Sequence, residues 1–260
     1  MNLQISRWPG FIAVAAIFIG APWAPGQDKV VPAANLERSE LDQPLALLQE
    51  AKRNYAVVKD YTCHLVSQER VRGKLEDKNI IDFRLKTEPF SVSMRWLAPK
   101  SAVGQEVVFV AGKNNNKMRV KSNKLGTKII GFISIDPNDP RVLEHSRHTI
   151  VEAGIGNMIE QNLRHWEIAR KAGKTKVEMS EATYNGRKCI CIEVTAKEQG
   201  PQNYCYRSVI YLEEKSKLPM RLENYDWPRQ GGERGGDLIK SFSYIDLRFN
   251  VGLKDEEFNK

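Results

Sequence analysis

The chain has 260 residues, a formal net charge of +8 and four cysteines. The basic balance favours anionic partners such as lipid headgroups or envelope polyanions, with simple solubility as the alternative. The sequence contains neither the Gly-x-Ser-x-Gly motif of a serine hydrolase nor the Cys-x-x-Cys spacing of a zinc site. We therefore predict no enzymatic activity, no metal and no cofactor.

The beginning of the chain has the layout of a signal peptide. Arg7 precedes an apolar run at 11–19, and the small residues Ala24 and Gly26 precede the expected cleavage point. The run is shorter than the roughly 20 apolar residues that span a bilayer, although an uncleaved anchor is the alternative. We expect a periplasmic or extracellular protein with three segments: a cleaved signal peptide, a flexible leader and a single domain, at residues 1–26, 27–41 and 42–260.

The first half of the expected domain reads as one helix followed by a series of strands. Asp42 and Pro44 are suited to the start of an amphipathic helix that ends near Lys59. Period-two alternation then predicts strands, separated by turn residues, at 61–71, 79–86, 90–96, 105–111 and 117–121. Short strands joined by tight turns indicate an antiparallel meander.

Two of these strands carry a set of large apolar side chains on one face. The set is predicted to line the inner side of the sheet and consists of Phe83, Leu85, Val92, Met94 and Trp96. The functional interpretation is an apolar concavity that binds lipid. The alternative is an ordinary core covered by a helix at 156–171.

The last strand of this half is strongly basic, because the segment 107–135 contains no acidic residue. Alternation places Lys117, Arg119 and Lys121 on one face, where they would contact an anionic membrane surface at about 1 kcal/mol per charge. A solvated hairpin is the alternative. No aromatic residue occurs in 110–131, so binding to single-stranded nucleic acid is not expected.

Between the two groups of strands, apolar residues at helical spacing predict a helix over 149–171. Gly154 and Gly156 weaken its start, and Glu160 is expected to pair with Arg164 on its outer face.

Histidine and glutamate residues between positions 144 and 165 could be considered as metal ligands. They are His145, His148, His165, Glu144 and Glu152. No third ligand stands at motif spacing, so we interpret the histidines as surface or capping residues. Glu69 and Arg70 are interpreted as a structural ion pair.

After Gly173 the period returns to two. Strands are predicted at 177–184, 188–195, 204–212, 219–227 and 238–248, with a hairpin turn at Asn185-Gly186.

The even number of cysteines in an exported protein favours disulfides among Cys63, Cys189, Cys191 and Cys205. Cys189 and Cys191 share one face of a strand and are not expected to bond each other. Cys205 is expected opposite one of them, with the remaining one reaching Cys63. All three connectivities stay open.

Several motifs resemble a bacterial family known as domain of unknown function 1571. They are Asp60-Tyr61-Thr62-Cys63, Phe90-x-Val92-x-Met94-Arg95-Trp96-x-x-Pro99, Thr149-Ile150-x-Glu152-Ala153-Gly154-Ile155-Gly156 and Leu218-Pro219-x-Arg221-Leu222. The resemblance covers about residues 45–258. More distantly, the chain is similar to the outer-membrane lipoprotein carriers and related periplasmic lipid-binding proteins.

The resemblance implies an α+β fold in which a strongly curved antiparallel sheet forms an open half-barrel with helices across its concave face. It implies much less about activity, since fold does not fix function. We predict a monomeric, exported, non-enzymatic protein that holds lipid or lipoprotein acyl chains. The alternative is an envelope sensor or interaction module that recognises a protein or an anionic polymer.

Overall fold

The computed structural model describes residues 39–123, 131–144 and 146–260. The predicted signal peptide at 1–26 and most of the predicted leader at 27–41 lie outside the described residues. Within the described part, neither α-helix combines the length and apolarity that a membrane span requires.

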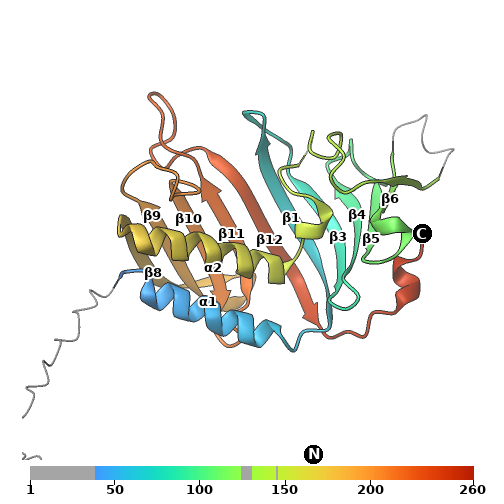
Figure 1. Ribbon diagram of the computed structural model, residues 1–260, viewed down its shortest axis with the longest axis horizontal. Coiled ribbons are helices and arrows are strands. Elements are labelled where there is room, and N and C mark those ends of the chain that lie inside the picture. Colours follow the sequence, from blue (N-terminus) through green and yellow to red (C-terminus); the bar gives the residue numbers. More distant parts are fainter. Residues whose placement is uncertain (1–38, 124–130, 145) are drawn as a thin grey trace, which may run out of the picture. The chain divides into compact units, whose positions relative to one another are not determined.

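The described residues form one antiparallel sheet of 12 strands with two α-helices (Figure 1). The strands of the first half are β1 (Asp60–Val71), β2 (Lys74–Leu75), β3 (Asn79–Lys86), β4 (Ser91–Ala98), β5 (Glu106–Val110), β6 (Met118–Lys121) and β7 (Ile133–Ile135). Those of the second half are β8 (Thr175–Tyr184), β9 (Arg187–Ala196), β10 (Arg207–Glu213), β11 (Pro219–Tyr225) and β12 (Leu238–Phe249). The helices are α1 (Asp42–Tyr55) and α2 (Ile155–Ala172), and single 3-10 turns are η1 (Asn114–Asn116), η2 (Ile150–Glu152) and η3 (Asp255–Phe258).

The sheet consists of two meanders joined at the centre. Its strand order is β7-β6-β5-β4-β3-β1-β12-β11-β10-β9-β8, with β2 paired to β1 alone. The central pair, β1 with β12, runs from Tyr61 opposite Phe249 to Glu69 opposite Lys240, with a shift of register between Thr62 and His64. Because β7 and β8 are edges rather than partners, the sheet is open, as the predicted fold class requires.

Both helices lie across one face of the second meander (Figure 1). Their apolar stripes enter the main core through residues such as Leu48 of α1 and Ile159 and Trp166 of α2. Two ion pairs join the helices at their surface, Lys52–Glu160 at 2.7 Å and Arg170–Asp42 at 2.5 Å. The predicted arrangement of helices on a one-sided antiparallel sheet is confirmed.

A few sequence predictions need correction. Glu160 pairs with Lys52 of α1 and not with Arg164, because α1 lies against that side of α2. The strand predicted from Tyr204 begins at Arg207, and β2 and β7 were not predicted. Both of these strands are very short, so alternation over their length gives almost no signal.

Candidate functional site

The five predicted lipid-binding residues lie on β3 and β4. Phe83, Leu85 and Val92 are completely buried, whereas Met94 and Trp96 are partly buried against the same core. The indole N–H of Trp96 donates to Asn79 Oδ1 at 3.1 Å, which fixes the ring over β3. In this conformation the protein itself therefore covers the side chains of Phe83, Leu85 and Val92. Contact of the five with a ligand stays a prediction.

The cover over Leu85 is the first turn of α2, which approaches the sheet through glycine. A Cβ at Gly154 would lie 2.5 Å from Leu85 Cδ1 and 2.9 Å from Tyr61 Oη, and Gly154 has a φ of 100°. The next residue, Ile155, donates its backbone N–H to the hydroxyl of Tyr61 at 2.9 Å. Gly154 therefore permits a contact between helix and sheet that any side chain would prevent.

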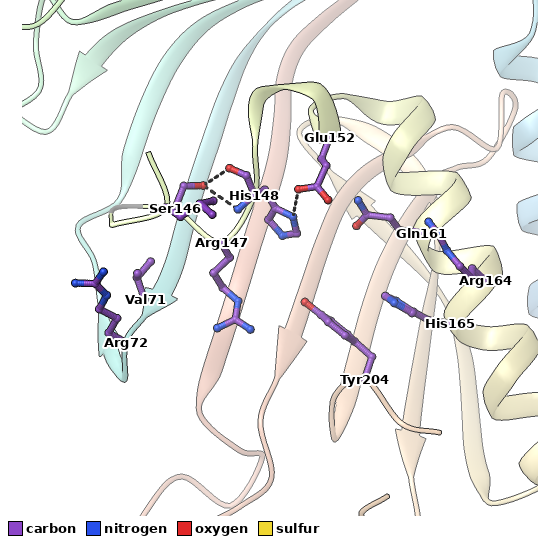
Figure 2. A pocket seen from close by; sticks show the side chains of 11 residues that line it. Val71, Arg72, Ser146, Arg147, His148, Glu152, Gln161, Arg164, His165 and Tyr204 are labelled. Carbon is purple, nitrogen blue, oxygen red and sulfur yellow. Dashed lines mark hydrogen bonds and ion pairs between the residues drawn. The ribbon is translucent and has the colours of Figure 1, made fainter. Parts of the chain in front are cut away.

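A cavity of about 510 Å³ lies between the tip of the β1–β2 hairpin and α2 (Figure 2). The hairpin contributes Val71 and Arg72, and the opposite wall comes from Gln161, Arg164 and His165 of α2. The remaining lining residues come from two loops and from η2, and are Leu143, Ser146, Arg147, His148, Glu152 and Tyr204. The volume falls within the range of small-molecule sites.

Beside this cavity, the structure buries a network of charged and polar groups. Ser146 donates its hydroxyl to Glu69 Oε2 at 2.9 Å, and Glu69 Oε1 lies 3.8 Å from His148 Nε2. Lys240 is only 3% exposed, and its Nζ lies 3.1 Å from His148 Nε2. An ammonium group can only donate, so His148 accepts at Nε2 and carries its proton at Nδ1, 3.4 Å from Glu152 Oε2.

Burial and neighbouring charge set the protonation of this network. Burial, together with the positive charge of Lys240, lowers the pKa of His148 to about 4, although Glu152 opposes this shift. Burial also lowers the pKa of Lys240 to about 8, against the attraction of Glu69. The pKa of Glu69 is raised by burial, while hydrogen bonds from Ser146 and Arg147 act in the opposite direction. At neutral pH the histidine is therefore neutral and Lys240 is mostly charged.

An aromatic stack forms part of the cavity wall. His165 and Tyr204 are stacked, with ring centroids 4.4 Å apart and an interplanar angle of 8° (Figure 2). The ammonium of Lys240 lies 5.1 Å from the centroid of Tyr204. Tyr204 thus links the exposed part of the site with the buried lysine.

A second cavity of about 260 Å³ lies on the other side of α2. Its apolar lining residues are Tyr55, Phe90, Ala153 and Ile159. The polar lining residues are Lys52, Thr87, Asn157 and Glu160, together with the backbone at Gly156. The smaller cavity therefore borders the first turns of α2, at residues 156–160, and the larger cavity borders its middle, at residues 161–165.

The predicted basic face follows β6, but two of its three charges are engaged by the chain itself. Lys121 Nζ lies 3.2 Å from Glu106 Oε1, because these residues are opposite each other on β6 and β5. Arg119 donates to Ser134 Oγ and to the backbone carbonyl of Lys260. Lys117 is exposed. Contact of this face with an anionic surface stays a prediction.

All four cysteines are free thiols in the structure. The β9–β10 register places Cys189 opposite Glu213 and Cys191 opposite Tyr211, so the expectation that Cys205 faces one of them is wrong. Cys205 precedes β10 and accepts a hydrogen bond from Asn224 Nδ2 of β11 at 3.1 Å. Cys63 lies on β1, which three strands separate from β9 in the sheet order.

Several residues of the larger cavity were assigned other roles from the sequence. Glu69 and Arg70 are not an ion pair, because Arg70 donates to the carbonyl of Leu238 while Glu69 bonds Ser146. His148 is neither a free surface residue nor a cap, since it packs on Lys240. The only local sequence signal for this network was a charged residue within a strand that also carries apolar residues, as at Glu69 and Lys240. Among the described residues, no group of His, Cys, Asp and Glu has a geometry that could hold a metal ion.

Comparison with protein families gives one match. The family described as "Protein of unknown function (DUF1571)" covers residues 58–260. The chain belongs to this family. The comparison with curated proteins found no match.

Solved structures similar to this chain include the following three. Lipoprotein LppX of Mycobacterium tuberculosis is 10% identical over 82% of this chain and 98% of its own, with a TM-score of 0.46. A putative outer membrane lipoprotein-sorting protein domain of Vibrio parahaemolyticus is 12% identical over 83% and 95%, with a TM-score of 0.40. A LolA superfamily protein of Nitrosomonas europaea is 11% identical over 83% and 96%, with a TM-score of 0.33.

Proposed function

We propose that this protein is an exported, non-enzymatic binding protein that holds lipid or the acyl chains of an envelope molecule between α2 and the open sheet. The observation that carries the proposal is the position of the two cavities. They lie in succession along α2, the smaller at residues 156–160 and the larger at 161–165, and the apolar face of β1 and β3 lies directly beneath its first turn. A displacement of that turn would join the two cavities across an apolar floor.

The first turn of α2 is suited to such a displacement. Its contact with the sheet runs through Gly154, and the backbone N–H of Ile155 donates to the hydroxyl of Tyr61. Ile155 and Leu85 are both buried, so moving the turn exposes apolar surface that only an apolar ligand can cover again. Each methylene of an acyl chain contributes about 0.8 kcal/mol when it is buried in this way.

The proposed mechanism is exchange rather than chemistry. The acyl chain replaces the contacts of the α2 turn with Leu85 and Tyr61, and the turn closes again when the ligand leaves. In this scheme Phe83 and Val92 form the floor of the acyl-chain site. The half-buried Met94 and Trp96, further along β4, form its side wall. The closed state without ligand keeps the same apolar surface dry.

The test is native mass spectrometry of the full chain, purified after export, combined with hydrogen exchange. We expect co-purified lipid, and we expect lipid loading to change exchange in the first turn of α2 while its last turn stays unchanged. Glu160→Trp places a bulky ring at the mouth of the smaller cavity and should lower lipid occupancy by about tenfold.

Glu167→Trp is the matched control, because Glu167 is an exposed glutamate of the same helix that lines neither cavity described above. It should leave occupancy unchanged. Persistent absence of lipid from every preparation, with no change in exchange on incubation with lipid, would contradict the proposal. That outcome would leave the interaction-module alternative, in which the same surface recognises a protein or an anionic polymer.

A further inference from the structure

The larger cavity gathers cationic side chains from three separate elements. Arg72 comes from the β1–β2 hairpin, Arg147 from the loop before η2, and Arg164 from α2 (Figure 2). Glu152 is the one carboxylate among the lining residues. It is already engaged, because it accepts the backbone N–H of Thr149 at 3.0 Å and faces His148.

None of these three guanidinium groups forms an ion pair within the described part of the chain. Arg147 donates to the backbone carbonyl of Arg70 at 3.1 Å, which holds it beside the hairpin. Arg164 would be neutralised by Glu160 one turn earlier, but Glu160 turns to Lys52 instead. The three guanidinium groups that line the cavity thus have no ion-pair partner among the described residues.

The wall behind the arginines adds to the positive potential. Lys240 is buried there, and its ammonium group donates a hydrogen bond to His148 Nε2. His148 lies between Lys240 and Glu152 and is neutral, so it adds no negative charge. Glu69 is bonded into this layer through Ser146, and with Glu152 it makes two carboxylates beside four cationic side chains. Cations therefore outnumber carboxylates in the cavity and its wall. Two apolar residues, Val71 and Leu143, complete the lining beside the arginines.

We infer that this cavity binds a phosphate group, carried either by a phospholipid headgroup or by a soluble phosphate ester. Guanidinium groups present paired N–H donors that match the oxygens of phosphate, and such charge-assisted bonds are among the strongest in proteins. The cavity has the volume for a headgroup, and its apolar side allows the first part of a chain to continue toward α2. The lipid form of this inference rests on the function proposed above.

The basic face of β6 is the other place where an anion would be sought. There Lys121 is neutralised by Glu106, and Arg119 is bonded to the chain itself. That face is also a strand surface and lines neither of the two cavities. The arginine-lined cavity is therefore the better site for a single phosphate group.

The test compares ligands that share acyl chains and differ in the headgroup, bound to the delipidated full chain. The probes are dioleoyl phosphatidylglycerol, dioleoyl phosphatidylcholine and dioleoylglycerol, with glycerol phosphate as the probe without chains. We expect phosphatidylglycerol to bind about tenfold more tightly than dioleoylglycerol, which has no phosphate. Phosphatidylcholine should fall between them, because its choline offsets the charge of its phosphate. Arg72→Gln combined with Arg164→Gln should remove this preference and leave the affinity for dioleoylglycerol unchanged.

The matched control is Arg53→Gln combined with Arg248→Gln, which removes the same charge from exposed arginines outside both cavities and should change each affinity less than about twofold. Equal affinity for all three lipids, or equal loss in both double variants, would overturn the phosphate site while leaving the lipid-binding proposal intact. Arginine-dependent binding of glycerol phosphate without binding of any lipid would support the phosphate site and overturn the lipid proposal. Binding of no probe at all would overturn both.

Discussion

The neutral state of His148 follows from its surroundings rather than from its residue type. Lys240, Arg147, Glu69 and Glu152 are the charged groups that face it, and burial is the largest cause of its lowered pKa, about 4. An unfolded histidine has a pKa near 6.5. Between these two values the unfolded chain binds a proton that the folded chain does not, so stability must fall as the pH falls through this window.

His148→Gln should therefore weaken the pH dependence of folding. The free energy of unfolding of the unmodified protein should lose about 2–3 kcal/mol, relative to the variant, between pH 6.5 and pH 4. Urea denaturation across this range measures the difference. His64→Gln, at a histidine whose side chain is 47% exposed, is the control. Parallel curves for His148→Gln and the unmodified protein would show that His148 is not held neutral.

At the scale of elements, the close contact between α2 and the sheet depends on Gly154. Strands β1 and β3 lie under the first turn, and the hydroxyl of Tyr61 holds that turn by a hydrogen bond. The glycine was visible in the sequence only as a weakness in a helix. Its tertiary role is to remove a side chain where helix and sheet meet.

Gly154→Ala should destabilise the fold by forcing the first turn of α2 away from Leu85. Gly173→Ala is the matched control, since Gly173 also has a positive φ, 67°, but a Cβ there meets no atom within 4 Å. The control pays only the backbone strain, about 1–2 kcal/mol, whereas Gly154→Ala should cost about 2 kcal/mol more. Chemical denaturation of both variants measures this. Equal losses would mean that the turn yields without cost.

At the scale of the whole molecule, the net charge is +8, and its cationic side chains differ in whether they have acidic partners. The three arginines of the larger cavity have no carboxylate partner among the described residues, whereas part of the basic face of β6 is neutralised. The predicted contact of that face with an anionic surface thus depends chiefly on Lys117. The paired charges of this face still contribute to the electrostatic potential around it, because surface charges act over roughly 8 Å at physiological salt.

Reversal of the three charges at Lys117, Arg119 and Lys121 to Glu should weaken association with anionic vesicles. Lys117→Glu alone should give most of the effect, at about 1 kcal/mol per surface charge, because Lys121 and Arg119 are already bonded within the chain. Vesicle co-sedimentation at two salt concentrations measures it. The control reverses three exposed lysines elsewhere, at Lys171, Lys188 and Lys215. An equal effect of both triple variants would show that only net charge matters.

The sequence alone determined the elements and their faces, because alternation and helical spacing are local properties. Phe83 and Leu85 were predicted on the apolar face of one strand, and both are buried. The strand at 79–86 also begins and ends where it was predicted. Local periodicity says nothing about what lies opposite, so it could not distinguish an open apolar concavity from the filled one that α2 covers.

Tertiary structure decided the candidate site. Glu69 and Lys240 face each other only because β1 and β12 pair in that register, and His148 reaches both from a separate segment. The arginines at 72, 147 and 164 are likewise distant along the chain, and no local pattern relates them. The error about Cys205 has the same origin, since it assumed a hairpin register that the strands do not adopt. Pairing across long sequence separations depends on the packing of the whole sheet. This packing brings the charged side chains of the larger cavity and its wall together beside an apolar core.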